Sequence, residues 1–166
     1  LIGPHLLTYE EFNTVIIQIE AILNSRPLSV LSADPNGPTA LTPAHFLTLG
    51  PPLDQLPLED LSSVPSNHLD HFQRISQIVQ GFWKRWQREY LHTLQGRSKW
   101  TEDASNLETG SVVIIMRENT PPLQWPIAVV QEICPGPDGI TRVARLRTSR
   151  GELIRPLVKI CPLPSQ

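Results

Sequence analysis

The spacing of the apolar residues changes once along this chain of 166 residues, and that change constrains the fold more than any other feature. Up to about residue 95 the apolar residues recur at helical spacing, and from Leu107 onward they follow the pattern of β-strands. The seventeen prolines cluster in the connections between these segments. The pattern therefore predicts an α+β protein whose helices come first and whose strands come last.

The first predicted helix covers residues 9–24. Thr8 and Glu11 form a capping box at its start, because the Thr8 hydroxyl can reach the backbone N–H of Glu11 and the Glu11 carboxylate can reach back. Pro27 prevents the helix from continuing. A second, short helix is predicted to begin at Thr42-Pro43 and to end before residue 50, since Pro suits the first helical position. Residues 51–66 are rich in Pro and Leu without a period and are predicted to be a linker.

A long amphipathic helix is predicted over about residues 67–95, within a connecting segment of residues 67–100 that is rich in basic and aromatic side chains. Its apolar stripe consists of Leu69, Phe72, Ile75, Val79, Phe82, Trp83, Trp86, Tyr90 and Leu94. At about 100° per residue, the cations Arg74, Lys84, Arg85 and Arg88 fall on the opposite arc. His68 and His71 form an HxxH pair, but no Cys or His lies close enough in sequence to complete a zinc site.

Four β-rich runs follow and predict a small antiparallel barrel of the SH3-like type over residues 107–164. The runs are Ser111–Arg117, Trp125–Ile133, Thr141–Thr148 and Glu152–Ile160. Turn formers separate them at residues 135–139 and 149–151. In the third run, Arg142, Ala144 and Leu146 would share one face, and Val143, Arg145 and Arg147 the other. Arginines would thus occupy much of the exposed surface.

The charges are distributed unevenly between the two halves of the chain. Residues 1–70 hold one cation, Arg26, and eight acids, whereas residues 71–166 hold thirteen cations and eight acids. A basic C-terminal half favours a polyanionic partner, although the overall net charge is −2 and charges can also cluster by chance on a solvated surface.

The two cysteines, Cys134 and Cys161, are too few for a disulfide framework and are expected to be reduced. No apolar run approaches the length of about 20 residues that a membrane span needs, and no secretory signal is present. We therefore expect an intracellular protein, nuclear or cytoplasmic, without a transmembrane segment. Because the sequence opens with Leu, we expect it to be a piece of a longer polypeptide.

Five segments together carry a family resemblance: LTYEEFNTVIIQIEAILNSRPLS, ALTPAHFLTLG, FWKRWQREYLHTLQGRSKW, NLETGSVVIIMRENTPPLQWPIAVV and RPLVKICPLP. In this order they resemble the C-terminal part of the Pol polyprotein of BEL/Pao-type LTR retrotransposons. The resemblance implies that residues 1–50 are the last helices of an RNase H-like integrase core. The segment 67–100 would then connect this core to the barrel domain of unknown function that follows it.

The resemblance also implies an active site of two Asp and one Glu that holds divalent metal for strand transfer. These residues are expected on segments that precede Leu1, and the His/Cys zinc module of integrases is absent. No catalytic residue is therefore carried over to this chain, and no cofactor is expected in it. A divalent metal is expected only for the full-length integrase, and a free-standing enzyme is the least favoured interpretation.

The resulting hypothesis is a non-catalytic, integrase-derived fragment that binds nucleic acid during DNA integration, with the remainder of the Pol polyprotein as a further partner. The candidate phosphate contacts are Lys84, Arg85, Arg88, Arg97, Lys99, Arg142, Arg145, Arg147, Arg150, Arg155 and Lys159. Trp100 could stack on a base or pack beside a helix end. The alternative is a protein-interaction module that uses the barrel, or that self-associates through Phe82, Trp83 and Trp86.

Overall fold

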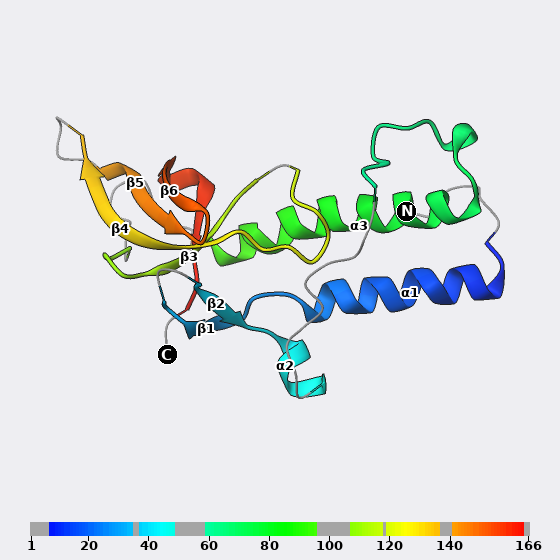
Figure 1. Cartoon of the computed structure of the whole chain (residues 1–166), viewed down its shortest axis with the longest axis horizontal. Helices are drawn as coiled ribbons and strands as arrows, with labels where there is room; N and C mark the ends of the chain where they lie inside the picture. The colour runs from blue at the N-terminus through cyan, green and yellow to red at the C-terminus, as the bar shows by residue number, and fades with distance from the viewer. Residues whose placement is uncertain are drawn as a thin grey trace. The chain divides into compact units, whose positions relative to one another are not determined.

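The computed structural model describes residues 7–34, 37–48, 59–95, 107–117, 119–136 and 141–164. These residues form three α-helices and seven strands in two antiparallel sheets, so the mixed α and β composition predicted from the sequence is confirmed (Figure 1). The chain divides into two compact units. Unit 1 consists of Leu1–Arg26, Pro43–Glu89 and Asn119–Gln124, and unit 2 of Pro27–Thr42, Tyr90–Glu118 and Trp125–Gln166. The predicted domain boundaries remain predictions.

Helix α1 (Tyr9–Asn24) has the limits that the capping box and Pro27 predicted. The Thr8 hydroxyl accepts a hydrogen bond from the Glu11 N–H at 3.3 Å, and Glu11 Oε2 accepts one from the Thr8 N–H at 2.8 Å. Val15 and Ile22 are the buried residues of this helix. Phe12, Ile16 and Ile17 are exposed, so only some of the apolar side chains of α1 are covered within the described structure.

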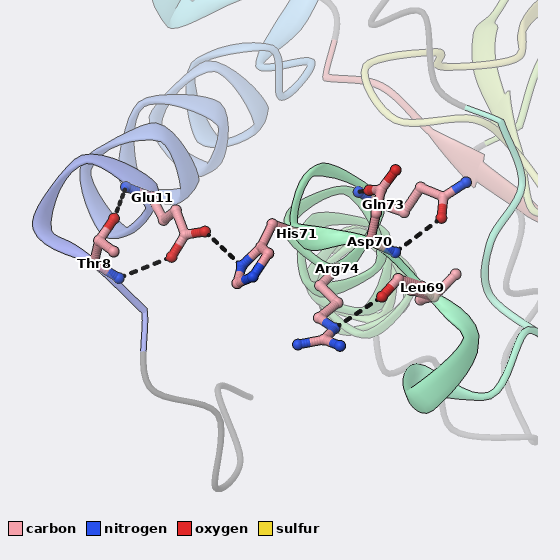
Figure 2. Close-up of polar contacts among 7 residues, drawn as sticks. All are labelled: Thr8, Glu11, Leu69, Asp70, His71, Gln73 and Arg74. Atoms are coloured by element: carbon pink, nitrogen blue, oxygen red, sulfur yellow. Dashed lines mark hydrogen bonds and ion pairs between the residues drawn. The ribbon is translucent and has the colours of Figure 1, made fainter.

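Helix α3 (His71–Leu94) begins four residues later than the predicted start at residue 67. Residues Ser66–His68 form a separate 3₁₀ turn instead. The reason is a second capping box: Asp70 Oδ1 accepts from the Gln73 N–H at 2.7 Å, and Gln73 Oε1 accepts from the Asp70 N–H at 3.1 Å (Figure 2). Asp-x-x-Gln satisfies the same backbone donors as Thr-x-x-Glu, and it sets the start of the helix.

The buried face of α3 differs from the predicted apolar stripe. Phe72 is 64% exposed, whereas the polar residues Ser76, Gln80 and Gln87 are buried. Gln80 is buried because its amide binds an extended backbone segment: its Oε1 accepts from the Leu61 N–H at 3.0 Å and its Nε2 donates to the Glu59 carbonyl at 2.6 Å. Of the predicted linker, residues 51–58 lie outside the described structure, and residues 59–64 lie along α3.

The short helix α2 (Pro43–Thr48) begins at the predicted proline, and residue 50 lies outside the described structure. Just before it, strands β1 (Ser29–Ser32) and β2 (Thr39–Leu41) form an antiparallel pair in unit 2. The sequence predicts no strand here, because turn formers dominate residues 32–38 and both strands are very short. Val30 lies opposite Ala40 in this hairpin.

The five-stranded sheet of unit 2 has the order β6-β5-β4-β3-β7, and every neighbouring pair is antiparallel (Figure 1). Its strands are β3 (Val112–Ile115), β4 (Ile127–Pro135), β5 (Thr141–Thr148), β6 (Gly151–Pro156) and β7 (Ile160–Pro162). The four predicted runs are therefore strands, with one correction. The run Glu152–Ile160 is not one strand, since β6 ends at Pro156, a 3₁₀ turn follows over Leu157–Lys159, and β7 starts at Ile160.

Strand β3 is buried on both faces of this sheet. Val113 and Ile115 belong to one apolar cluster, with Ala128, Val130, Ala144 and Leu146 from β4 and β5. Val112 and Ile114 belong to a second cluster, which also contains Ala40 of the hairpin, Leu91 of α3 and Cys161 of β7. A strand covered on both faces favours an uninterrupted apolar run, which explains the sequence Val-Val-Ile-Ile at this place.

No helix in the described ranges has both the length and the apolar character that crossing a bilayer would require.

Candidate nucleic-acid interface

Three of the predicted contact residues lie on the exposed face of α3 in unit 1. Lys84, Arg85 and Arg88 are exposed, and Val79 and Trp83 on the other side of the helix are 0% and 1% exposed. The predicted separation of cations from the buried face is therefore present in the folded helix. It follows from the helical period, because residues three, four and seven apart share one face.

Nearby acids neutralise this basic face only in part. Arg85 Nε lies 2.9 Å from Glu89 Oε1, but both side chains are more than 60% exposed, so the pair adds only a few tenths of a kcal/mol in water. The Ser62 hydroxyl and backbone N–H lower the pKa of Asp60, and the nearby Lys84 ammonium lowers it further. Arg88 has no ion-pair partner among the residues that the structure describes.

The aromatic residues of α3 differ in their roles. Trp83 is buried, and its indole Nε1 donates a hydrogen bond to the Thr120 carbonyl at 2.7 Å within unit 1. Phe82 and Trp86 are half-buried and stack with ring centroids 6.4 Å apart. Trp83 thus packs within its own unit, and self-association through Phe82, Trp83 and Trp86 stays a prediction.

The cations of the five-stranded sheet and its turns in unit 2 do not form one surface. Directly opposite residues of antiparallel strands share a face, so Arg155, which lies opposite the buried Ala144, is on the inner face of the sheet at its edge. Arg142 has the same parity in β5, whereas Arg145 and Arg147 are on the outer face. Arg150 lies in the β5–β6 turn and Lys159 in the 3₁₀ turn.

Acids face the two outward arginines of β5. Glu132 Oε2 lies 3.4 Å from Arg145 Nη1, and Glu152 is the register partner of Arg147. Opposite charges paired across strands reduce the field that a polyanion would meet. The positive potential of the outer face is thus weaker than the count of arginines predicted. Arg97, Lys99 and Trp100 lie outside the described residues.

His71 lies against a carboxylate. Its Nδ1 is 3.0 Å from Glu11 Oε1, in a contact that joins the first turns of α1 and α3 within unit 1 (Figure 2). The Thr8 N–H lowers the pKa of Glu11; desolvation opposes this effect and the His71 hydrogen bond adds to it. The described residues contain no group of three or more His, Cys, Asp or Glu side chains that could hold a metal ion.

Both cysteines have free thiols. Cys161 is fully buried, and burial raises its pKa to about 11. Its thiol donates to the Leu91 carbonyl at 3.5 Å, so it packs as a small apolar side chain. A thiol with so high a pKa is a poor nucleophile at neutral pH.

The fold and its surface define a small α+β protein in which a long helix with one basic face precedes a five-stranded antiparallel sheet. Residues 70–163 match the sequence model of DUF5641, a family of unknown function, and the chain belongs to this family. The match begins at the cap of α3 and ends after β7, so it covers the helix and the sheet together. Comparisons with curated proteins and with solved structures gave no match.

Proposed function

We propose that this protein is a non-catalytic, nucleic-acid-binding part of a retrotransposon-derived integrase of the BEL/Pao type, acting in DNA integration within a longer Pol polyprotein. The observation that carries the proposal is the row of exposed cations on α3. Lys84, Arg85 and Arg88 face solvent on the side opposite the buried residues, and one of them, Arg85, is paired with an acid. Such a row suits the phosphate backbone of nucleic acid, which binds cations without regard to sequence.

The strand order of unit 2 supports an SH3-like barrel as the finer description of the sheet. Four strands follow one another as antiparallel neighbours, and the fifth, β7, returns to pair with β3 after a 3₁₀ turn. This arrangement gives each apolar run one face toward a common cluster. Because barrels of this type serve many functions, the fold supports the proposal without specifying the ligand.

The exposed apolar face of α1 supports the assignment of residues 1–50 to an integrase core. Tyr9, Phe12 and Ile16 are 80%, 43% and 44% exposed and lie three and four residues apart. A contiguous apolar helix face in solvent is typical of a surface that another protein segment covers. In an RNase H-like core, a sheet would provide that cover.

The test is binding of a fluorescent DNA duplex by the 166-residue chain over a series of salt concentrations. We expect the affinity to fall at least tenfold between about 50 and 200 mM salt. Lys84→Glu combined with Arg88→Glu should abolish most binding and reduce the slope of log K against log salt by about 2. Glu89→Gln, which frees Arg85, should tighten binding. A flat salt response would reject the proposal.

A control for this test adds acids outside α3, and it changes the net charge by half as much as the double Glu variant does. Asn13→Glu combined with Thr109→Glu introduces two negative charges at exposed positions of α1 and of the turn before β3. We expect a change in affinity of less than about threefold, since no cation is lost and no acid is added on the basic face of α3. An equal loss in this control would mean that net charge alone determines binding.

Protein interaction through the sheet is a second candidate. Ile154 and Val158 are 55% and 73% exposed in β6 and the 3₁₀ turn that follows it, and could contact a partner. If this is the function, the chain should not bind DNA in a salt-dependent way. Ile154→Lys should then weaken partner binding or dimer formation. Size-exclusion chromatography with light scattering distinguishes it from the first proposal.

A further inference from the structure

Gly81 lies inside α3, where a glycine weakens the helix relative to alanine. It is exposed, and apart from its two chain neighbours and the adjoining backbone of its own helix, no atom of the described chain lies within 4 Å of the position that a Cβ would take. Gly110 and Gly151 differ from it, because their φ values of 93° and 121° require glycine in turns. The described part of the chain thus contains no steric or conformational reason for glycine at position 81.

The position of Gly81 among the cations of α3 provides a reason. Arg74, Gly81 and Arg88 are seven residues apart, so they lie nearly in line along the helix at intervals of about 10 Å. Lys84 and Arg85 are one turn beyond Gly81 on either side of this line. The helix backbone is therefore bare at the centre of its own basic face.

Arg74 keeps a defined place at the first end of this line. Its Nε donates to the Leu69 carbonyl at 3.1 Å, and its terminal nitrogens point away from that carbonyl (Figure 2). Asp70, the nearest acid in sequence, uses Oδ1 to cap the helix by accepting from the Gln73 N–H. Arg74 is thus oriented by the backbone just before the helix, and among the described residues neither Arg74 nor Arg88 has an ion-pair partner.

We propose that the sugar-phosphate backbone of nucleic acid crosses α3 at Gly81, closer to the helix than any side chain would allow. The inference rests on the proposed function and adds the place and the closeness of the contact. A missing side chain permits the close approach, and the flanking cations meet the neighbouring phosphates. The flanking charges favour a polyanion over the apolar surface of a second helix.

The experiment compares Gly81→Ala and Gly81→Gln with the unmodified chain, using a random-sequence DNA duplex of about 20 base pairs and thermal unfolding in parallel. Both substitutions should raise the melting temperature, because both residues favour a helix more than glycine does. Binding should move the other way: Gly81→Gln should weaken it about fivefold or more, and Gly81→Ala by less. The salt slope should not change, since no cation is lost.

Asn13→Ala is the matched control, because it improves helix propensity at an exposed position of α1. It should raise the melting temperature and leave duplex binding unchanged. If Gly81→Gln is folded and binds like the unmodified chain, or if it changes the oligomeric state instead of the affinity, the inference is wrong while the proposed function stands. If the unmodified chain binds no duplex, both are wrong.

Discussion

Leu123 combines a buried side chain with a backbone conformation that non-glycine residues rarely adopt. Its φ is 69° and its side chain is 5% exposed in unit 1. The Gln124 N–H donates to the Pro121 carbonyl at 3.2 Å, and Pro122 and Leu123 are the two central residues of that turn. Proline followed by a residue with positive φ is typical of a type II turn, in which glycine is preferred at the position of Leu123.

We therefore expect the Leu123→Gly variant to be more stable than the Leu123→Ala variant, although glycine buries less apolar surface. Leu123→Ala should cost about 2–4 kcal/mol through lost burial, and it keeps the strained φ. Leu123→Gly loses slightly more apolar surface but relieves the strain, so it should be about 1 kcal/mol more stable than the Ala variant. Urea unfolding of both variants measures the difference. An Ala variant equal to or more stable than the Gly variant would contradict the role given to the turn.

The contacts of Glu11 should make the stability of the fold depend on pH. Its pKa is lowered from 4.5 chiefly by the Thr8 N–H, so the folded state favours the carboxylate. A depressed folded pKa means that the stabilisation is present above the unfolded pKa and is lost as the pH falls through the folded value. We expect the melting temperature of the unmodified chain to fall more steeply below pH 4.5 than that of Glu11→Gln. Parallel curves over this range would show that the capping box does not favour the charged form.

At the scale of elements, the sequence predicted the strongly periodic segments well. The capping box of Thr8 and Glu11 set the start of α1 correctly, because both partners are adjacent on the helix and need nothing from elsewhere in the chain. The cations of α3 were also placed on the correct face, since only the helical period decides that. Local chemistry was sufficient in these cases.

The features that the sequence did not predict depend on contacts between residues far apart in the chain. Gln80 is buried because residues 59–61 lie against it, about twenty positions earlier in the chain, and no local pattern signals that pairing. The hairpin β1–β2 and strand β7 are too short to show an apolar period. They are stabilised by packing their apolar side chains against β3 and its neighbours. Arg155 is exposed at the edge of the sheet but shares the face of Ala144 because of its register with β5, which the sequence alone does not specify.

The edge strand β6 has two features that hinder pairing with a strand of another molecule. Pro156 supplies no N–H, and Arg155 Nη1 donates to the Ile154 carbonyl at 3.3 Å. We expect Arg155→Val combined with Pro156→Val to create an edge that pairs with a second copy. Light scattering should then show association that increases with concentration. Thr109→Val, at an exposed turn, is the control and should stay like the unmodified chain.

At the scale of the whole molecule, exposed apolar side chains gather on unit 1. Tyr9, Phe12 and Ile16 of α1 share a face, and Phe46 and Leu47 of α2 are 66% and 67% exposed. Because Phe12 and Ile16 contribute little to the described core, we expect Phe12→Lys combined with Ile16→Lys to change the free energy of unfolding by less than about 1 kcal/mol. The same variant should reduce self-association and precipitation of the isolated chain.

Val15→Lys is the matched control for this variant, since Val15 is adjacent in sequence but 1% exposed. It should cost at least about 3 kcal/mol, because it buries an unpaired charge. Urea unfolding and light scattering measure the two effects separately. If the double variant is as destabilised as Val15→Lys, the α1 face is part of the core and not a partner surface.

Strand β3 has a consequence for the order in which the chain can fold during its synthesis. The second apolar cluster around β3 contains Ala40 and also Cys161 and Leu163, which are synthesised much later than Ala40. The Val30 N–H donates to the Pro164 carbonyl at 3.3 Å, which ties the early hairpin to the last described residue. During synthesis, the core of unit 2 therefore cannot be completed when the hairpin emerges from the ribosome. It can be completed only after some 120 further residues have been added and Pro164 has left the exit tunnel.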